Sequence, residues 1–213
     1  MRRYAGFALL LSLALLWGCG GGRTVRVDVP PRMDLGHYQA LGLVEFASNA
    51  DPAVNALATR RFQEQVQAAQ PGTPFLELGS RQAVLAAVGG EQFDANTLRK
   101  IGARYHVDAV FLGEIVYSQP RTDVNLADLA RLQGDVRSEI RADMSSRLLL
   151  TASGASVWSS SSWAKRQISH VSVSQYGVSA TTSSSDPREE MVQALVYHLT
   201  DDFRPTWTRR PAP

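Results

Sequence analysis

The chain has 213 residues, of which 44% are hydrophobic and 20% are charged, and it contains 1 cysteine. These fractions are typical of a globular protein and exclude a disordered one. The formal net charge is +2, and no cluster of lysine and arginine follows the first residues, so a nucleic-acid-binding protein is not indicated. A single cysteine cannot form an internal disulfide, so the core alone must stabilise the fold.

The amino terminus has the pattern of an export signal. Arg2 and Arg3 precede an apolar run from Phe7 to Trp17, which is too short to span a bilayer permanently. The run ends at Leu16-Trp-Gly-Cys19, which resembles the lipobox of bacterial lipoproteins. In that family the peptidase cleaves before the cysteine, which then carries diacylglycerol and an acyl chain. The resemblance implies that residues 1–18 are removed and that Cys19 is the lipidated amino terminus.

The residue after the cysteine implies a location. Gly20 stands where an aspartate would imply the inner membrane, so by resemblance the protein is anchored in the outer membrane and faces the periplasm. The alternative is an ordinary signal peptide with a spare cysteine, although lipidation explains the lone thiol. We therefore divide the chain into a signal peptide (1–18), a lipidated tether (19–37), a globular domain (38–205) and a loose tail (206–213).

The first half of the chain alternates strands and helices. Thr24–Val29 is a weak strand, and residues 38–46 form the first core strand. Asp51 caps a helix that begins at Pro52 and carries an apolar face from Val54 to Ala69. Pro71-Gly72 ends this helix, and residues 75–78 form a second strand. Two short helices follow, capped by Ser80 and Asp94.

The central strand of the predicted sheet lies between Val107 and Val116. Its residues form a nearly continuous apolar run, which is typical of a strand covered by helices on both faces. Asp108 at the strand entrance and Gly113 within the strand interrupt this run. A glycine at that position either lets another side chain approach closely or marks a bend.

The second half is dominated by a predicted hairpin, Val136–Ile168. From Val136 to Leu150 apolar and polar residues alternate, which favours a half-buried strand over the competing helix. We expect one set to face the core (Val136, Ile140, Met144, Leu148) and the other to face water (Arg137, Glu139, Arg141, Arg147). The turn at Ser153-Gly154 leads into the return arm.

Three further segments complete the pattern. Ser118–Leu132 is undecided, and its residues 123–132 fit a short surface helix. Ser169–Ser185 is rich in serine and threonine and alternates only locally. Asp186-Pro187 caps a final helix with an apolar stripe. The predicted class is α/β (α+β): a single mixed sheet flanked by helices, in the order β-α-β-α-α-β followed by a long β-hairpin and a C-terminal helix.

Residues 38–168 resemble a family of periplasmic α/β domains of outer-membrane lipoproteins. The family includes lipoprotein activators of penicillin-binding proteins, the amino-terminal domain of TolB and the curli-secretion channel lipoproteins. The resemblance rests on these segments: Leu41–Phe46, Ile101-Gly, Val107–Ile115 and Ser153-Gly-Ala-Ser-Val-Trp158-Ser159. His106-Val107-Asp108 stands where the family has glycine-alanine-aspartate. The resemblance implies the fold, whereas its members do different jobs.

No set of catalytic residues emerges from the sequence. Ser162-Trp-Ala-Lys165 has the serine-x-x-lysine spacing of penicillin-recognising enzymes. That chemistry needs both side chains on one face, whereas positions i and i+3 of a strand point to opposite faces. We interpret the motif as part of a serine-rich strand. The four histidines are scattered along the sequence, so we predict no metal site, no cofactor and no enzyme.

The sequence therefore predicts a lipid-anchored, non-enzymatic adaptor or activator of an envelope complex, whose domain binds another envelope protein. We expect the hairpin to form the binding surface, with Trp163, Arg141 and Arg147 as partner-binding residues. Trp158 matches the family's structural tryptophan and is expected in the core. One alternative is a subunit of an outer-membrane secretion channel similar to the curli channel, which needs membrane strands of about 9–11 residues in hairpins. The other is an envelope hydrolase.

Overall fold

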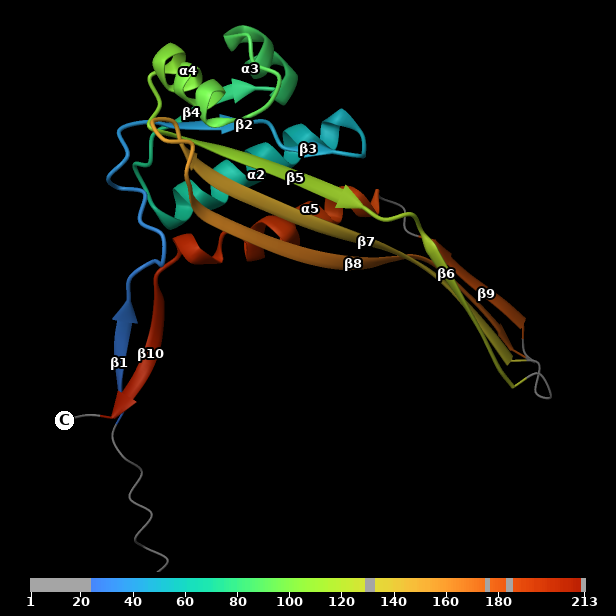
Figure 1. Cartoon of the computed structure of the whole chain (residues 1–213). Coiled ribbons are helices and arrows are strands. Elements are labelled where there is room, and N and C mark those ends of the chain that lie inside the picture. Colours follow the sequence, from blue (N-terminus) through green and yellow to red (C-terminus); the bar gives the residue numbers. More distant parts are fainter. Residues whose placement is uncertain (1–23, 129–132, 175–176, 183–185, 212–213) are drawn as a thin grey trace, which may run out of the picture. The chain divides into compact units, whose positions relative to one another are not determined.

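The computed structural model describes residues 24–128, 133–174, 177–182 and 186–211 (Figure 1). The predicted signal peptide, residues 1–18, and the predicted lipidation site, Cys19, lie outside the described residues. The described chain divides into two compact units. One unit comprises Pro31–Arg204, and the other joins the segments before Pro31 and after Arg204. The predicted extent of the signal peptide and the predicted start of the tether stay predictions.

The smaller unit is a two-stranded antiparallel ribbon of β1 (Thr24–Val29) and β10 (Thr206–Pro211). The predicted strand at Thr24–Val29 is confirmed. The predicted loose tail is wrong over Thr206–Pro211, because this polar segment pairs with a strand from the opposite end of the chain. A short polar strand has too little periodicity of its own to be recognised without that partner.

The larger unit is a mixed sheet flanked by helices. Its elements in chain order are β2 (Leu41–Val44), β3 (Ala47–Ser48), α2 (Pro52–Ala69), β4 (Phe75–Gly79), α3 (Arg81–Val88), α4 (Ala95–Tyr105), β5 (Ala109–Tyr117), β6 (Arg121–Asp128), β7 (Gln133–Leu150), β8 (Ser156–Ser174), β9 (Gly177–Thr182), α5 (Pro187–Leu199) and the 3₁₀ helix η2 (Asp201–Phe203). The strand order is β4-β2-β5-β7-β8-β9, with β3 on β5 and β6 on β7. Strand β2 is parallel to β4 and β5, and β5, β7, β8 and β9 pair antiparallel. The predicted class and element order are confirmed.

The helices begin where the sequence predicts. Each predicted cap accepts a hydrogen bond from a backbone N–H of the first turn, which satisfies one of the groups that a helix start leaves unpaired. The capping residues are Asp51, Ser80, Asp94 and Asp186. Pro52 and Pro187 follow two of these caps at the first helical position, where proline fits.

One face of the sheet packs against α2, α5 and η2. The alternation predicted for β7 is confirmed for Ile140, Met144 and Leu148, which are buried on this inner face, whereas Val136 is only half-buried. At its centre Phe111 contacts the ring of Phe62, with 5.1 Å between ring centres. Trp158 of β8 completes the aromatic cluster, 5.8 Å from Phe111 and 4.7 Å from Phe203. Trp158 is only 8% exposed, so its predicted place in the core is confirmed.

The other face is covered only in part. Helices α3 and α4 place Val84, Leu98 and Ile101 in a second core cluster with Val110 and Leu112 of β5. In Figure 1, α3 and α4 lie above β2 and β4, whereas α2 and α5 lie behind β5, β7 and β8. Strand β5 is therefore buried on both faces along its first half, whereas the predicted cover of the whole run to Val116 is wrong at its end, because α3 and α4 do not reach Glu114 and Val116, which are exposed.

Gly113 lets a side chain of the inner core approach the strand. A Cβ atom added at Gly113 would lie 2.1 Å from Cε1 of Phe46, far inside van der Waals contact. The ring of Phe46 therefore occupies the space that any larger residue would fill. The predicted close approach at this glycine is confirmed.

His106 ends helix α4 in a left-handed conformation, with a φ of 55°. This is the position at which the sequence departs from the glycine of the resembled family, and glycine adopts that conformation at lower cost. Asp108, two residues later, accepts hydrogen bonds from the backbone N–H groups of Gln39 at 2.6 Å and Ala40 at 3.3 Å. Asp108 thus fixes the start of β2 beside the start of β5.

Two undecided segments form strands. The possible helix at residues 123–132 is wrong where it overlaps β6, which pairs with β7 so that Val124 faces Val136. Strand β8 continues to Ser174, and β9 pairs with that extension. The spacing of the apolar residues fits either a strand or a helix, and pairing with the long β7 decides between them. In Figure 1 these strands continue the sheet beyond the helices.

Truncation of Phe111 should destabilise the protein strongly. Because Phe111 is fully buried among aromatic rings, Phe111→Ala should lower the free energy of unfolding by about 3–5 kcal/mol. Val116→Ala on the same strand is the matched control, because Val116 is exposed and its loss should change that free energy by about 0.5 kcal/mol or less. Urea unfolding measures both values. Equal midpoints for Phe111→Ala and the wild type would remove β5 from the core.

Candidate interaction surface

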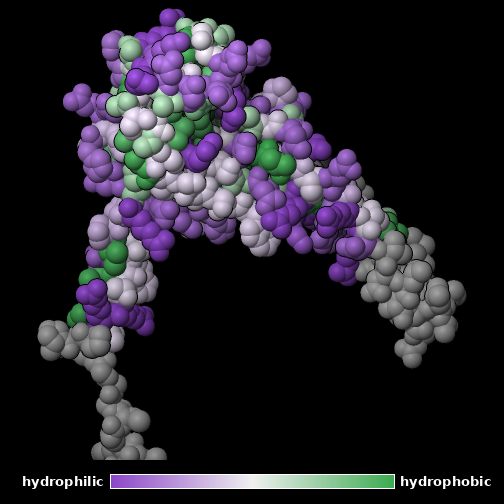
Figure 2. Space-filling model, in the orientation of Figure 1, coloured by the Kyte–Doolittle hydropathy of each residue, from purple (hydrophilic) through white to green (hydrophobic). Residues whose placement is uncertain are grey.

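The sheet has an open face where the cover by α3 and α4 ends. Along β5, residues 109–113 are buried, whereas Glu114 and Val116 are exposed. The outer residues of β7 and β8 continue this open face, which points toward the viewer in Figure 1. Figure 2 shows mostly hydrophilic and neutral residues there, with a small hydrophobic patch. We call the outer face formed by residues 114–118, 141–147 and 157–165 the open face.

The strand register brings two exposed apolar residues into one row. Asp143 of β7 is the Cα partner of Val116 on one side and of Trp163 on the other. Residues paired in this way share a face of the sheet. Val116 is 52% exposed and Trp163 is 60% exposed. The next row contains Glu114, Ser145 and Ser161, so the tryptophan is surrounded by small and charged side chains.

Arg141 and Asp143 hold a charged pair against the tryptophan. The guanidinium carbon of Arg141 lies 5.1 Å from the centre of the Trp163 ring, within range of a cation–π contact. Arg141 Nε donates a hydrogen bond to Asp143 Oδ2 at 2.9 Å. This bond lowers the pKa of Asp143 and raises the pKa of Arg141. Both groups are therefore charged at neutral pH, and together they orient the guanidinium plane.

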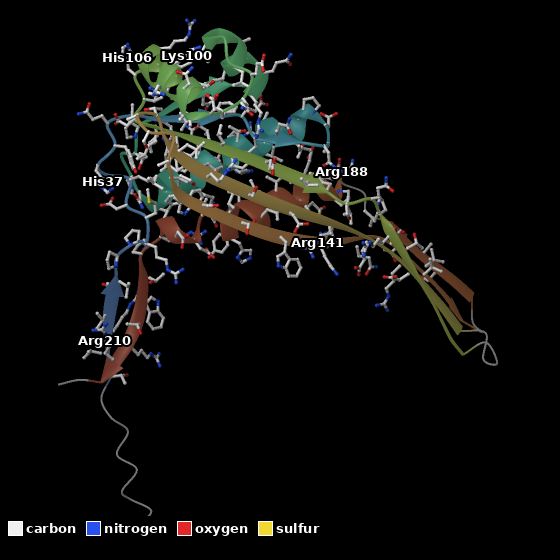
Figure 3. All side chains as sticks on the ribbon, in the orientation of Figure 1. His37, Lys100, His106, Arg141, Arg188 and Arg210 are labelled. Carbon is white, nitrogen blue, oxygen red and sulfur yellow. The ribbon has the colours of Figure 1, made fainter. Side chains whose placement is uncertain are left out.

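A polar hollow of about 400 Å³ adjoins this pair. Its lining residues come from β6, β7, β8 and the segment after β5: Ser118, Arg121, Asp123, Glu139, Ile140, Arg141 and Lys165. Ser118 is fixed there because its backbone N–H donates to Arg141 O at 2.8 Å. Figure 3 labels Arg141 near the point where β6 joins the sheet. The hollow offers both cationic and acidic groups beside one exposed aromatic ring.

The structure places the predicted partner-binding residues in two groups. Trp163 and Arg141 contact each other, whereas Arg147 lines a different hollow with Arg81, Glu91 and Asp94 near α3 and α4. Arg147 is exposed on the same face but is separated from Asp143 by the row that contains Ser145. No contact joins Arg147 to Trp163 in the part of the chain that the structure describes.

The serine-x-x-lysine motif has no shared site. Ser162 is buried, and its hydroxyl donates to Leu195 O of α5 at 2.8 Å. Lys165 is exposed and lines the polar hollow of the open face. The two side chains therefore lie on opposite faces of β8, as predicted. Among the described residues no group of three or more His, Cys, Asp or Glu side chains has metal-binding geometry, and none of their helices is long and apolar enough to cross a membrane.

Sequence reasoning did not select Val116 and Asp143 for this surface. Val116 belongs to the apolar run of β5, which predicts a place in the core, and Asp143 is one of several charged residues in the alternation of β7. Only the strand register shows that both residues lie in the same row of the open face as the exposed Trp163. The one signal of the end of the α3–α4 cover in the sequence of β5 is Glu114, the only charged residue of that strand, which is exposed there.

Comparison with known proteins gives remote similarities of fold. No family model matches the chain, and no curated protein matches it. The PelC dodecamer from Paraburkholderia phytofirmans is 13% identical over 86% of this chain and 97% of its own, with a TM-score of 0.41. The LpoB C-terminal domain from Salmonella enterica is 13% identical over 73% and 93%, with a TM-score of 0.35.

A third solved structure, lipoprotein GNA1162 from Neisseria meningitidis, is 12% identical over 73% of this chain and 92% of its own, with a TM-score of 0.37. Identities and TM-scores at this level do not assign the chain to a family, and no statement about function follows from them.

The two tryptophans of β8 should differ sharply in their effect on stability. Trp163→Ala should leave the free energy of unfolding within about 0.5 kcal/mol of the wild type, because this side chain is mostly exposed. Trp158→Ala should lower that free energy by about 3–5 kcal/mol, because Trp158 packs on Phe111 and Phe203. Urea unfolding checks both. A loss for Trp163→Ala as large as that for Trp158→Ala would place Trp163 in the core.

Proposed function

We propose that this protein is an outer-membrane lipoprotein whose periplasmic domain binds another envelope protein through the open face, as a non-enzymatic adaptor or activator of an envelope complex. The observation that carries the proposal is Trp163: it is 60% exposed on an uncovered sheet face, next to Arg141. A large apolar side chain in that position gains little from folding, because most of its surface stays in water.

The chemistry of the open face suits a protein partner. Tryptophan and arginine are the residues most enriched among those that dominate binding energy at protein interfaces. Trp163 supplies a rigid apolar surface, and Asp143 fixes the guanidinium of Arg141 beside it. The serines on the same face of β8, Ser159 and Ser161, are small and can form hydrogen bonds with a partner. Such a mostly polar surface fits a complex whose components are also stable apart.

The proposed anchor restricts the choice of partner. A Cys19 that carries acyl chains would hold the domain at the outer membrane, and Gly20 supports that location by its resemblance to the lipoprotein pattern. Anchoring confines the domain to the periplasmic surface of the membrane, so the partner is an envelope protein that reaches this surface. Ser162 donates its hydroxyl proton to α5, so its geometry does not favour the alternative of an envelope hydrolase.

A second candidate is a subunit of an outer-membrane secretion channel. The extension in which β6 pairs with β7, and β8 with β9, favours it, because such channels require adjacent hairpins. However, β6 has 8 residues and β9 has 6, whereas a strand needs about 9–11 residues to cross a bilayer. We therefore place this candidate second.

Removal of the Trp163 side chain should weaken binding of the partner. A photoreactive amino acid at Ser161, in the neighbouring row of the open face, should give a defined adduct in intact cells, and Trp163→Ala should reduce its yield about tenfold. Trp207→Ala is the matched control, since Trp207 is also exposed but belongs to the smaller unit. If both variants give the wild-type adduct, the open face is not the binding surface.

Substitution of Cys19 tests the anchor and separates the two candidates. Cys19→Ser should lose acyl labelling, and the protein should appear as a soluble periplasmic form or as a full-length precursor. Unchanged labelling would show that Cys19 is not lipidated. Processed protein that lacks acyl chains and still resists extraction from the membrane with alkaline carbonate would favour the channel subunit over the adaptor.

A further inference from the structure

Strand β8 leaves a long edge of the sheet without a partner strand. On one side it pairs with β7 along almost its whole length. On the other side, the pairing with β9 begins only at Ser169, opposite Thr182. In the part of the chain that the structure describes, no strand pairs with the outer edge from Ser156 to Ile168. The backbone groups that point to this edge lack the ladder that every inner strand has.

This edge is protected at one end only. Lys165 and Arg166 carry charge, which discourages the addition of a strand, and the register shift between Ser138 and Glu139 marks a bulge near Ile168. By contrast, Ser156–Ala164 contains neither a charged residue nor a proline. A regular, uncharged edge of this length is a template for pairing with another strand.

We propose that the edge of β8 pairs with the same edge of a second copy of this chain, antiparallel, about a two-fold axis at Ser160. A two-fold axis perpendicular to the sheet matches each residue with one at the same distance on the other side of Ser160. Ser160 then faces Ser160 of the second copy, and Val157 faces Trp163 of the second copy. The paired segment is Ser156–Ala164 in both copies.

The apolar residues of this segment complement one another in that register. Val157 and Trp163 are 40% and 60% exposed. Val157 of each copy lies opposite Trp163 of the other copy, so the two-fold axis generates this pair twice. An aromatic residue opposite a β-branched residue is a favourable cross-strand pair. The positions between them hold only serine on the outer face, Ser159 and Ser161, so the two strands can approach without steric conflict.

The charges of the strand also permit self-pairing. Lys165 and Arg166 fall outside the paired segment, and each faces the turn at 154–155 of the second copy, where no charged residue lies. Arg166 is further neutralised by its ion pair with Glu190 of α5. Like charges therefore never face each other across the axis. Strand β8 contains no acidic residue, so a strand that is added to its edge needs no basic residue opposite Ser156–Ala164. The same segment of a second copy contains none.

Such a dimer would extend the open face instead of covering it. Edge pairing joins two sheets side by side, so the outer faces of both copies become continuous. Trp163 keeps the surface that points away from the sheet. The proposal does not depend on the proposed function, because the dimer needs no envelope partner.

Charge placed at the axis provides the test. Ser160→Lys puts two like charges directly opposite each other, as does Ser160→Glu, and either change should raise the dimer dissociation constant roughly tenfold or more. An equimolar mixture of the two variants should recover dimers, because opposite charges then face each other. The matched control is Ser145→Lys, on β7 and away from the edge, which should leave the dimer intact. Native mass spectrometry of the full processed chain, released from detergent, measures the masses.

A cysteine at the axis gives an independent measurement. Ser160→Cys in intact cells should form disulfide-linked dimers, because directly facing residues place their Cβ atoms about 5 Å apart. Ser145→Cys should not, and the wild type controls for any reaction of Cys19. This measurement stands even if Ser160→Lys fails to fold.

The outcomes are distinct. A monomeric wild type at high concentration, together with no disulfide dimer at position 160, overturns the proposal. Cross-linking from position 160 to a different envelope protein also overturns it and assigns the edge to that protein. In either case the adduct from position 161 can persist, so the failure of the dimer is separate from a failure of the proposed partner-binding surface.

Discussion

Burial of both faces of β5 over residues 109–113 is the constraint on which the rest of the structure depends. An apolar strand of this kind cannot be exposed on either side without a large loss of hydrophobic stabilisation. Phe111 and Ile115 therefore face the layer of α2, α5 and η2, whereas Val110 and Leu112 face α3 and α4. The crossovers between parallel strands supply these helices: α2 connects β2 to β4, and α3 and α4 connect β4 to β5. These two crossovers run in opposite directions across the order β4-β2-β5, so crossovers of the same hand place their helices on opposite faces of the sheet.

The cover by α3 and α4 is smaller than the sheet, and this mismatch creates the open face. Antiparallel strands can leave one face in water provided that their outer residues are polar. Strands β7 and β8 follow this rule with Arg141, Asp143, Ser159 and Ser161. Val157 and Trp163 are the exceptions on β8, and Trp163 is the larger and more exposed of the two. An exception that folding does not require is the strongest indication of binding on this face.

Strand β8 contributes to two different surfaces. Its outer side chains belong to the open face, and its backbone forms the unpaired edge. The inner side is already used, since Trp158 and Ser162 fix the strand to η2 and α5. A rigid strand with one face buried is well suited to present both surfaces, because binding then costs little conformational entropy. Occupation of the edge and of the face would be thermodynamically linked through Trp163, which lies at the boundary of both.

The sequence by itself determined the local structure: the helix caps at Asp51, Ser80, Asp94 and Asp186 and the alternation of β7 follow from short-range chemistry and strand periodicity. It also placed Trp158 in the core, whereas the choice between a close approach and a bend at Gly113, and the exposure of Trp163, needed the tertiary structure. Only the tertiary structure decided that residues 121–128 form a strand, that Thr206–Pro211 pairs with β1, that Arg141 contacts Trp163 whereas Arg147 does not, and that β8 has an unpaired edge. The reason is physical: each of these features depends on pairing with, or cover by, a segment that is distant in the chain. The energy of such contacts cannot be determined from the residues of either segment alone.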